Sequence, residues 1–167
     1  MTDSDTPQSL YERFNSNAEF QAAVDRLLTC DGRELRIFDP DLVSLRMNSP
    51  ERIERLETFL AESRTRKVCI ALHQSEHVTG HCPRFMALLG RYSHAIEVRR
   101  TDEAIRNLQD AFLVLDRNHY VRRPVARFFR GALGIFDKSE ALSMHSRHAE
   151  IWAASSPAVS ATTAGLR

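Results

Sequence analysis

The sequence has little of the material from which cross-links and phosphate-binding loops are built. Its 167 residues include three cysteines and six glycines. Cys30, Cys69 and Cys82 form no C-x-x-C pair, and their odd number does not suit a secreted disulfide framework. G-x-S-x-G, H-E-x-x-H and a glycine-rich phosphate loop are also absent. We therefore expect neither a disulfide scaffold nor a loop-bound nucleotide, and we expect no cofactor.

An excess of charge of one sign and long apolar runs are lacking as well. The formal net charge is +1, so no global field favours nucleic acid or a membrane. The apolar runs are only a few residues long, far short of a membrane span. The polar, acidic start, MTDSDTPQSLYERF, does not have the pattern of a signal peptide. These absences predict a reduced, cytoplasmic protein with no membrane partner.

The chain has the length of one domain, and its composition changes at both ends. Residues 1–16 are polar and rich in Ser, Thr and Asp, and residues 155–167 are small, polar and aperiodic. We expect both segments to be disordered tails. The folded domain is therefore predicted over residues 17–154.

Hydrophobic periodicity predicts alternating helices and strands between the tails. Helices are expected over 17–28 with Asn17 as the N-cap, over 50–64 after the capping Ser49, over 83–92, and from Asp137 or Ser139 to 154. Strands are expected over 34–38, 67–73, 95–99, 110–116, 119–123 and 131–136, with a loop around Gly80. Residues 110–116 and 119–123 are predicted to form a hairpin. This order predicts an α/β fold with a mixed, mostly parallel sheet flanked by helices.

The element order resembles one half of the phospholipase D superfamily. The characteristic strand of that family carries the motif H-x-K-x-x-x-x-D, and Asp116 matches the acid of the motif when residues 109–116 are aligned with it. Gln109 then stands where the family has its nucleophilic His, and Ala111 where it has its Lys. The small Gly/Ser-Asn stretch that usually follows the motif is replaced by residues 120–124. The sequence is also similar to an uncharacterised proteobacterial family of about this length, sometimes appended to acetyltransferases, which supplies no mechanism.

The resemblance implies a fold whose family chemistry has been lost. In that family the His attacks phosphorus and the Lys stabilises charge on the phosphoryl oxygens. Gln109 has no basic lone pair for the attack, and Ala111 has no charge for the oxygens. We therefore expect no catalytic residues and a binding or regulatory role, with a homodimer or a partner protein implied because such halves usually pair across a common face.

Arginines and aromatic residues cluster after the motif strand. Residues 117–130 hold five arginines and no acid, with His119, Tyr120, Phe128 and Phe129 interleaved. Arginine binds phosphate through two parallel hydrogen bonds, and aromatic rings stack on bases. The segment predicts a phosphate-bearing ligand at Arg122 or Arg123 with His119, near Asp116 and Arg99. Weak nucleic-acid binding through residues 117–130, or a set of solvated surface charges, are the alternatives.

A second group of polar residues follows the strand predicted over 67–73. His73, His77, His81 and Cys82 are of types that bind zinc, but their spacing matches no standard zinc site, so no metal is predicted. Because loops at strand ends form the ligand face of open α/β sheets, His73 and His81 can still line a pocket. An enzyme that uses His73, His81, Cys82 and Asp116 is therefore the alternative function. His145 and His148 are expected on the surface of the last helix.

Overall fold

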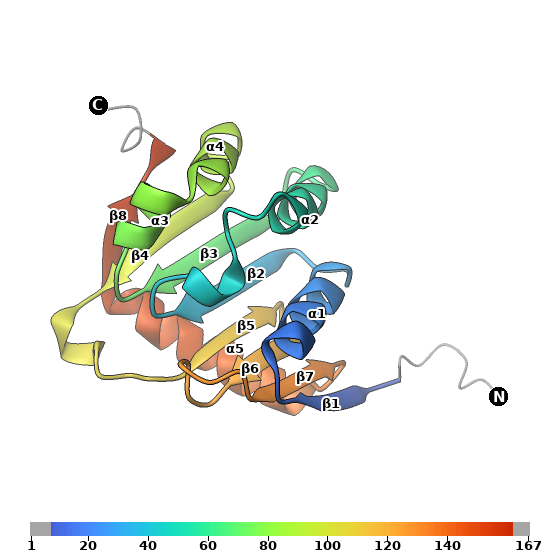
Figure 1. The fold of residues 1–167 in the computed structure, drawn as a ribbon. Coiled ribbons are helices and arrows are strands. Elements are labelled where there is room, and N and C mark those ends of the chain that lie inside the picture. Colours follow the sequence, from blue (N-terminus) through green and yellow to red (C-terminus); the bar gives the residue numbers. More distant parts are fainter. Residues whose placement is uncertain (1–7, 162–167) are drawn as a thin grey trace.

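The computed structural model describes residues 8–161. Within them, eight strands form one sheet in the order β1-β7-β6-β5-β2-β3-β4-β8 (Figure 1). The strands are β1 Leu10–Phe14, β2 Glu34–Asp39, β3 Lys67–Leu72, β4 Ile96–Thr101, β5 Ala111–Leu115, β6 His119–Arg123, β7 Gly131–Ile135 and β8 Ser155–Val159. The helices are α1 Asn17–Leu28, α2 Pro50–Ala61, α3 Glu76–His81, α4 Pro83–Arg91 and α5 Lys138–Ala153.

Local sequence signals explain where the longer helices begin. Ser16 caps α1 by accepting a hydrogen bond from the Glu19 N–H, so the cap is one residue earlier than the expected Asn17. Ser49 caps α2 as predicted, with Pro50 at the first helical position. Helix α2 ends at Ala61 rather than near Arg64.

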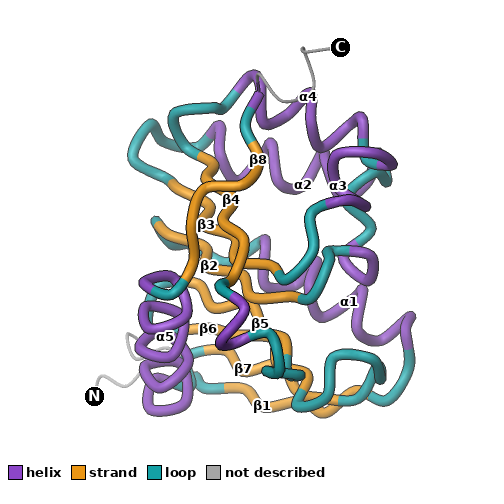
Figure 2. Tube along the Cα trace, turned by 90° about the vertical axis from the view of Figure 1, so that its left-hand side faces the viewer, coloured by secondary structure: helices purple, strands orange, loops and turns teal. Residues whose placement is uncertain are grey.

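The helices cover the two faces of the sheet unequally. Helices α1 to α4 lie on one face and α5 alone lies on the other, with the sheet between them (Figure 2). Strand residues alternate between the two cores: Leu35 and Ile37 of β2 belong to the cluster under α1–α4, whereas Phe38 belongs to the cluster under α5. The central strand β5 is buried along its whole length, which explains its continuous apolar run.

The expectation of a mostly parallel sheet is wrong. Only the pairs β2–β3 and β3–β4 are parallel, and the other pairs within residues 8–161 are antiparallel. The reason is the short connections of the second half of the chain. The turn between β5 and β6 spans residues 116–118, and such a turn can join only antiparallel strands. The predicted hairpin of β5 with β6 is confirmed by their register.

Two segments assigned to the tails form the edge strands instead. Strand β1 pairs with β7, and β8 pairs with β4. These strands could not be recognised from the sequence, because only Phe14 in β1 and Val159 in β8 are buried. Neither segment therefore shows the alternation of apolar and polar residues that marks a strand. The rest of the predicted tails, residues 1–7 and 162–167, lies outside the described residues. The loop expected around Gly80 is also wrong, since Glu76–His81 forms the short helix α3.

Candidate functional site

The positions of the family motif lie at opposite ends of the central strand β5. Strand β5 runs antiparallel to β2, with Phe112 opposite Phe38. Gln109 and Ala111 therefore lie beside the carboxyl ends of β2 and β3, whereas Asp116 lies beside their amino ends. The strand between them spans about 17 Å. Asp116 accepts hydrogen bonds from the backbone N–H groups of Arg33 and Glu34 at 2.9 to 3.2 Å, so it holds the start of β2 in place.

A buried ion pair occupies the space over Ala111. Ala111 pairs with Arg123 of β6, and Asp39 lies on its other side, one residue beyond the Phe38–Phe112 pair. The side chain of Ala111 is small enough for the Arg123 guanidinium to reach across it to Asp39, at 2.7 Å. Both side chains of the pair are 3% exposed. Ala111, the residue aligned with the motif Lys, therefore lies between the strand positions of a buried ion pair.

Further hydrogen bonds and a ring contact surround the Arg123–Asp39 ion pair. Arg123 also donates to Ser44 Oγ and to the Ala126 carbonyl, and its guanidinium stacks over the Phe20 ring at 4.5 Å. Asp39 also accepts from the Leu42 N–H at 2.7 Å. Burial raises the pKa of the Asp39 carboxyl and lowers the pKa of Arg123, and the attraction between the two charges opposes both shifts.

An open notch of about 410 Å³ lies above this pair, and we call it the carboxyl-end notch. Arg46 and Arg127 are exposed on its rim, and neither makes an ion pair within residues 8–161. Asn17, the first residue of α1, also lines the notch, so the positive end of that helix dipole lies beside it. Leu42 and Arg46 of the rim loop have left-handed backbone conformations, with φ of 68° and 53°. Strained loop residues of this kind gather at functional sites.

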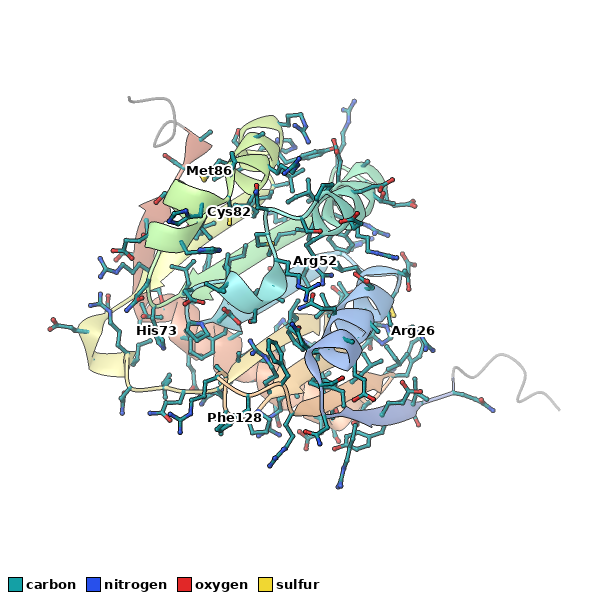
Figure 3. All side chains as sticks on the ribbon, in the orientation of Figure 1. Arg26, Arg52, His73, Cys82, Met86 and Phe128 are labelled. Atoms are coloured by element: carbon teal, nitrogen blue, oxygen red, sulfur yellow. The ribbon has the colours of Figure 1, made fainter. Side chains whose placement is uncertain are left out.

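His73 lies at the end of β3 but is not available to a ligand. The residue is 8% exposed, with Nδ1 2.6 Å from Thr101 Oγ1 and Nε2 2.9 Å from the Leu108 carbonyl oxygen. The carbonyl can only accept, so Nε2 carries the proton and Nδ1 accepts from the Thr101 hydroxyl. Figure 3 shows His73 at the margin of the sheet, near the loop that follows β4. Both ring nitrogens serve to join three segments of the chain.

The other residues of the alternative enzyme site are not brought together. His81 is exposed on α3, where its ring lies 5.6 Å from that of His77, and Cys82 is buried. Asp116 lies at the opposite end of the sheet. In the described part of the chain, no three His, Cys, Asp or Glu side chains are grouped so as to hold a metal ion.

The predicted phosphate ligands are likewise distributed over several places. His119 and Arg123 stand at the two ends of β6. Arg122 projects to the α5 side, where it lies 4.0 Å from Glu140. Arg99 stacks over Trp152 at 4.2 Å and pairs with Glu97. Of these residues, only Arg123 reaches the notch at the carboxyl end.

Sequence reasoning missed Asp39, Ser44 and Arg46. Asp39 ends the strand predicted near residues 34–38 and begins the segment DPD. An acidic residue at the end of a strand is the sequence feature that could have pointed to Asp39 as a site residue. Nothing in the sequence pairs it with Arg123, 84 positions further along the chain.

Solved structures share this fold at low sequence identity. TrmBL2, an archaeal chromatin protein whose structure shows a novel mode of DNA binding, superposes with a TM-score of 0.64 at 11% identity, over 89% of this chain and 54% of its own. Nuc from Salmonella typhimurium, a phospholipase D family member, gives 0.62 at 12% identity over 92% of this chain and 100% of Nuc. NucT from Helicobacter pylori gives 0.61 at 13% identity over 90% of this chain and 100% of NucT. The fold is therefore phospholipase D-like, although this chain spans only about half of the chromatin protein.

A protein-family model matches the amino-acid sequence itself. Residues 16–161 match the model described as "Domain of unknown function (DUF7931)", and the chain belongs to that family. No curated protein matches the sequence. None of the helices within residues 8–161 is long and apolar enough to cross a membrane.

Proposed function

We propose that this domain is a non-catalytic binding module with a phospholipase D-like fold, and that it holds a phosphate-bearing ligand at the carboxyl-end notch. The observation that carries the proposal is the buried Arg123–Asp39 pair over Ala111. A phosphodiesterase of this fold needs a nucleophile and a free cation at that place. Here the nucleophile position is Gln109, and the cation beside Ala111, Arg123, is neutralised by Asp39.

The rim of the notch supports a phosphate-bearing ligand. Arg46 and Arg127 present exposed guanidinium groups, which recognise phosphate through paired hydrogen bonds. The amino end of α1 adds a positive partial charge beside Asn17. The acids that line the notch are Asp39 and Asp41, and Arg123 already neutralises the first of them. The open charge at the rim is therefore mainly positive.

Binding of inorganic phosphate, followed by the amide resonances of residues 40–48 and 124–130, tests this site. We expect saturable shifts that the double variant Arg46→Gln/Arg127→Gln weakens at least about tenfold, because hydrogen bonds to charged groups are each worth about 1.5 to 3 kcal/mol. Arg64→Gln removes an exposed arginine elsewhere and should leave the affinity unchanged. Equal affinity in the double variant would remove the proposed site.

The non-catalytic half of the proposal is tested with a chromogenic phosphodiester such as bis(4-nitrophenyl) phosphate. We expect no hydrolysis above that of buffer, and none after Gln109→His/Ala111→Lys, because Arg123 fills the space that the new Lys needs. Turnover that rises in proportion to protein concentration in the unaltered chain would show that the module is an enzyme after all.

A second candidate function is weak binding of single-stranded nucleic acid. Phe128 is 52% exposed, and the Arg127 guanidinium lies 5.0 Å from its ring centre, on the loop between β6 and β7 (Figure 3). An exposed aromatic ring beside arginines suits base stacking. The affinity for an oligonucleotide should fall steeply with salt and should be lost in Arg122→Ala/Arg130→Ala. An unchanged affinity in that variant would exclude this function.

We also propose, by analogy with the paired halves of this superfamily, that the same end of the sheet meets a second copy or a partner protein. Val43, Val125 and Phe128 are large apolar side chains exposed on the loops there. Sedimentation tests the first arrangement, since the monomer has a mass of 19.1 kDa and a dimer would have twice that mass.

A further inference from the structure

A second pocket lies at the opposite end of the sheet, about 17 Å from the carboxyl-end notch by the length of the central strands. It has a volume of about 580 Å³ and is lined by segments that include the residues just before β2, the β5–β6 turn and the residue after β7. We call it the His119 pocket, after the side chain of β6 that lines it. Neither the family chemistry nor the proposed phosphate site uses this end of the molecule.

The backbone around the His119 pocket is unusually constrained. Asp116 and Phe136, which both line it, have left-handed conformations with φ of 53° and 54°. Gly32 allows the β5–β6 turn to approach β2, because a Cβ there would lie 2.7 Å from Leu115 Cδ1 and 3.0 Å from Asp116 Oδ2. A bulky residue such as Phe136 rarely adopts a positive φ without a compensating role. The strain at this end is therefore concentrated in residues that shape the pocket.

His119 contributes a hydrogen-bond donor that the fold does not use. Its side chain is buried, 2% exposed, and its Nδ1 accepts a hydrogen bond from the Phe136 N–H at 3.0 Å. Because Nδ1 accepts this bond, the proton of the neutral ring is on Nε2, and burial favours the neutral ring by lowering the pKa of His119. Within residues 8–161, Nε2 has no hydrogen-bond partner. Nε2 is not among the fully buried atoms that lack a partner, so it is open to an acceptor in the pocket that His119 lines.

The other unpaired side chains of the pocket, Arg33 and Asn118, both carry N–H donors. The Asp116 carboxylate is already occupied by three contacts from backbone N–H groups, and Asp31 is paired with Arg66 at 2.8 Å. The guanidinium of Arg33 makes no ion pair or hydrogen bond among the described residues, and the same holds for the side-chain amide of Asn118. The unused hydrogen-bonding capacity is therefore that of Arg33, Asn118 and His119 Nε2–H. These donors come from two segments, Arg33 before β2 and the consecutive Asn118 and His119, and they match the several acceptor oxygens of an oxyanion.

We propose that the His119 pocket binds a small molecule through an oxyanion group, a carboxylate or a phosphate, held by Arg33, Asn118 and His119 Nε2–H. The Phe136 ring forms the apolar part of the wall, against which the rest of the ligand packs. This site is independent of the carboxyl-end notch, because the two lining sets share no residue. The inference stands whether or not phosphate binds at the notch.

The test is an NMR titration with inorganic phosphate and, separately, with acetate at constant ionic strength. We expect saturable shifts at the amides of Arg33, Asn118 and Phe136, and the anion that produces them identifies the oxyanion. The bound anion should also raise the pKa of the His119 ring, which its imidazole resonances report. The amides around Arg46 and Arg127 report the other site in the same spectra, so failure at one site is distinguishable from failure at the other.

Arg33→Ala should weaken the binding at least about tenfold. Arg33 is exposed, so this variant should fold normally. Arg13→Ala removes an exposed arginine of β1 and serves as the matched control, with unchanged affinity. The proposal is overturned if neither anion gives saturable shifts at the three amides. It is equally overturned if Arg33→Ala binds as tightly as the unaltered chain.

Discussion

The two faces of the sheet bury polar groups in different ways. Under α1–α4, the charged pair Arg123–Asp39 has a partner for each buried charge. Under α5, His148 is 1% exposed, with Nε2 3.0 Å from the Ile37 carbonyl oxygen and Nδ1 without any partner. Under α1–α4 the buried charges are tolerated because they are fully paired, whereas under α5 the His148 ring must stay neutral. The stability of the packing under α1–α4 therefore depends on complementary charges, whereas the stability of the packing under α5 depends on pH.

The largest expected effect comes from removing one charge of the pair. Arg123→Met should lower the free energy of unfolding by about 3 to 5 kcal/mol, because it leaves the Asp39 carboxylate buried without a counter-charge. Urea denaturation measures the change. Adding Asp39→Leu to Arg123→Met should restore part of the stability, since an apolar pair replaces the ionic one. A loss of less than about 1 kcal/mol in the single variant would mean that the pair is not buried as described.

A fall in pH should destabilise the packing of α5 against the sheet. Burial lowers the pKa of His148 to about 4 from its usual 6.5. Between pH 6.5 and 4, His148 is protonated in the unfolded chain but stays neutral in the folded chain. The free energy of unfolding therefore falls as the pH falls from about 6.5 to 4. The full loss amounts to about 3 kcal/mol at 1.36 kcal/mol per pKa unit.

His148→Gln keeps an N–H donor for the Ile37 carbonyl but cannot titrate, so it isolates this contribution. Denaturation of both proteins across this pH range should show a shallower slope for the variant. Some slope remains in either case, because burial also lowers the pKa of His119 and His145. Identical slopes would show that His148 is not the group that acid protonates.

The smallest expected effect concerns close packing under α5. Gly134 lies opposite Tyr120, and a Cβ at that glycine would lie 2.3 Å from the tyrosine ring. The ring is held by a 2.6 Å hydrogen bond from its hydroxyl to Asp137, so it cannot move aside easily. Gly134→Ala should therefore cost about 1 to 3 kcal/mol in thermal or urea unfolding.

Gly32→Ala is the matched comparison, because the group it would meet is mainly the Leu115 side chain, which no hydrogen bond holds in place. We expect a smaller loss there. If Gly134→Ala were the milder of the two, the Tyr120 ring would have room that its hydrogen bond does not suggest.

Much of the fold could be predicted because its elements are local. Ser49 and Pro50 mark the start of α2, and the apolar run of residues 111–115 marks a buried central strand. Strand direction was harder, because it depends on how short turns join β5, β6 and β7 rather than on any strand's own sequence. The edge strands escaped because most of their side chains are exposed.

The sites were less predictable because they are made of distant segments. The sequence placed Arg123 and His119 in one site, but strand geometry separates them to the two ends of β6. It placed His148 on the helix surface, but that ring faces the sheet and stacks on Trp152. Three-residue spacing on a helix is compatible with either position, so only the packing of α5 against β2 decides it.

The strand order also determines how the chain would respond to force. Strands β1 and β8 are the opposite edges of the sheet, about 34 Å apart across its seven interstrand spacings. Figure 1 shows these two strands, the first and the last along the chain, at opposite sides of the sheet. Tension applied between the ends is thus directed largely across the strands, so the ladders of β1–β7 and β4–β8 open one hydrogen bond at a time. A domain tethered at both ends would give way at low force from its margins inward, while the central strands and the ion pair between them are still intact.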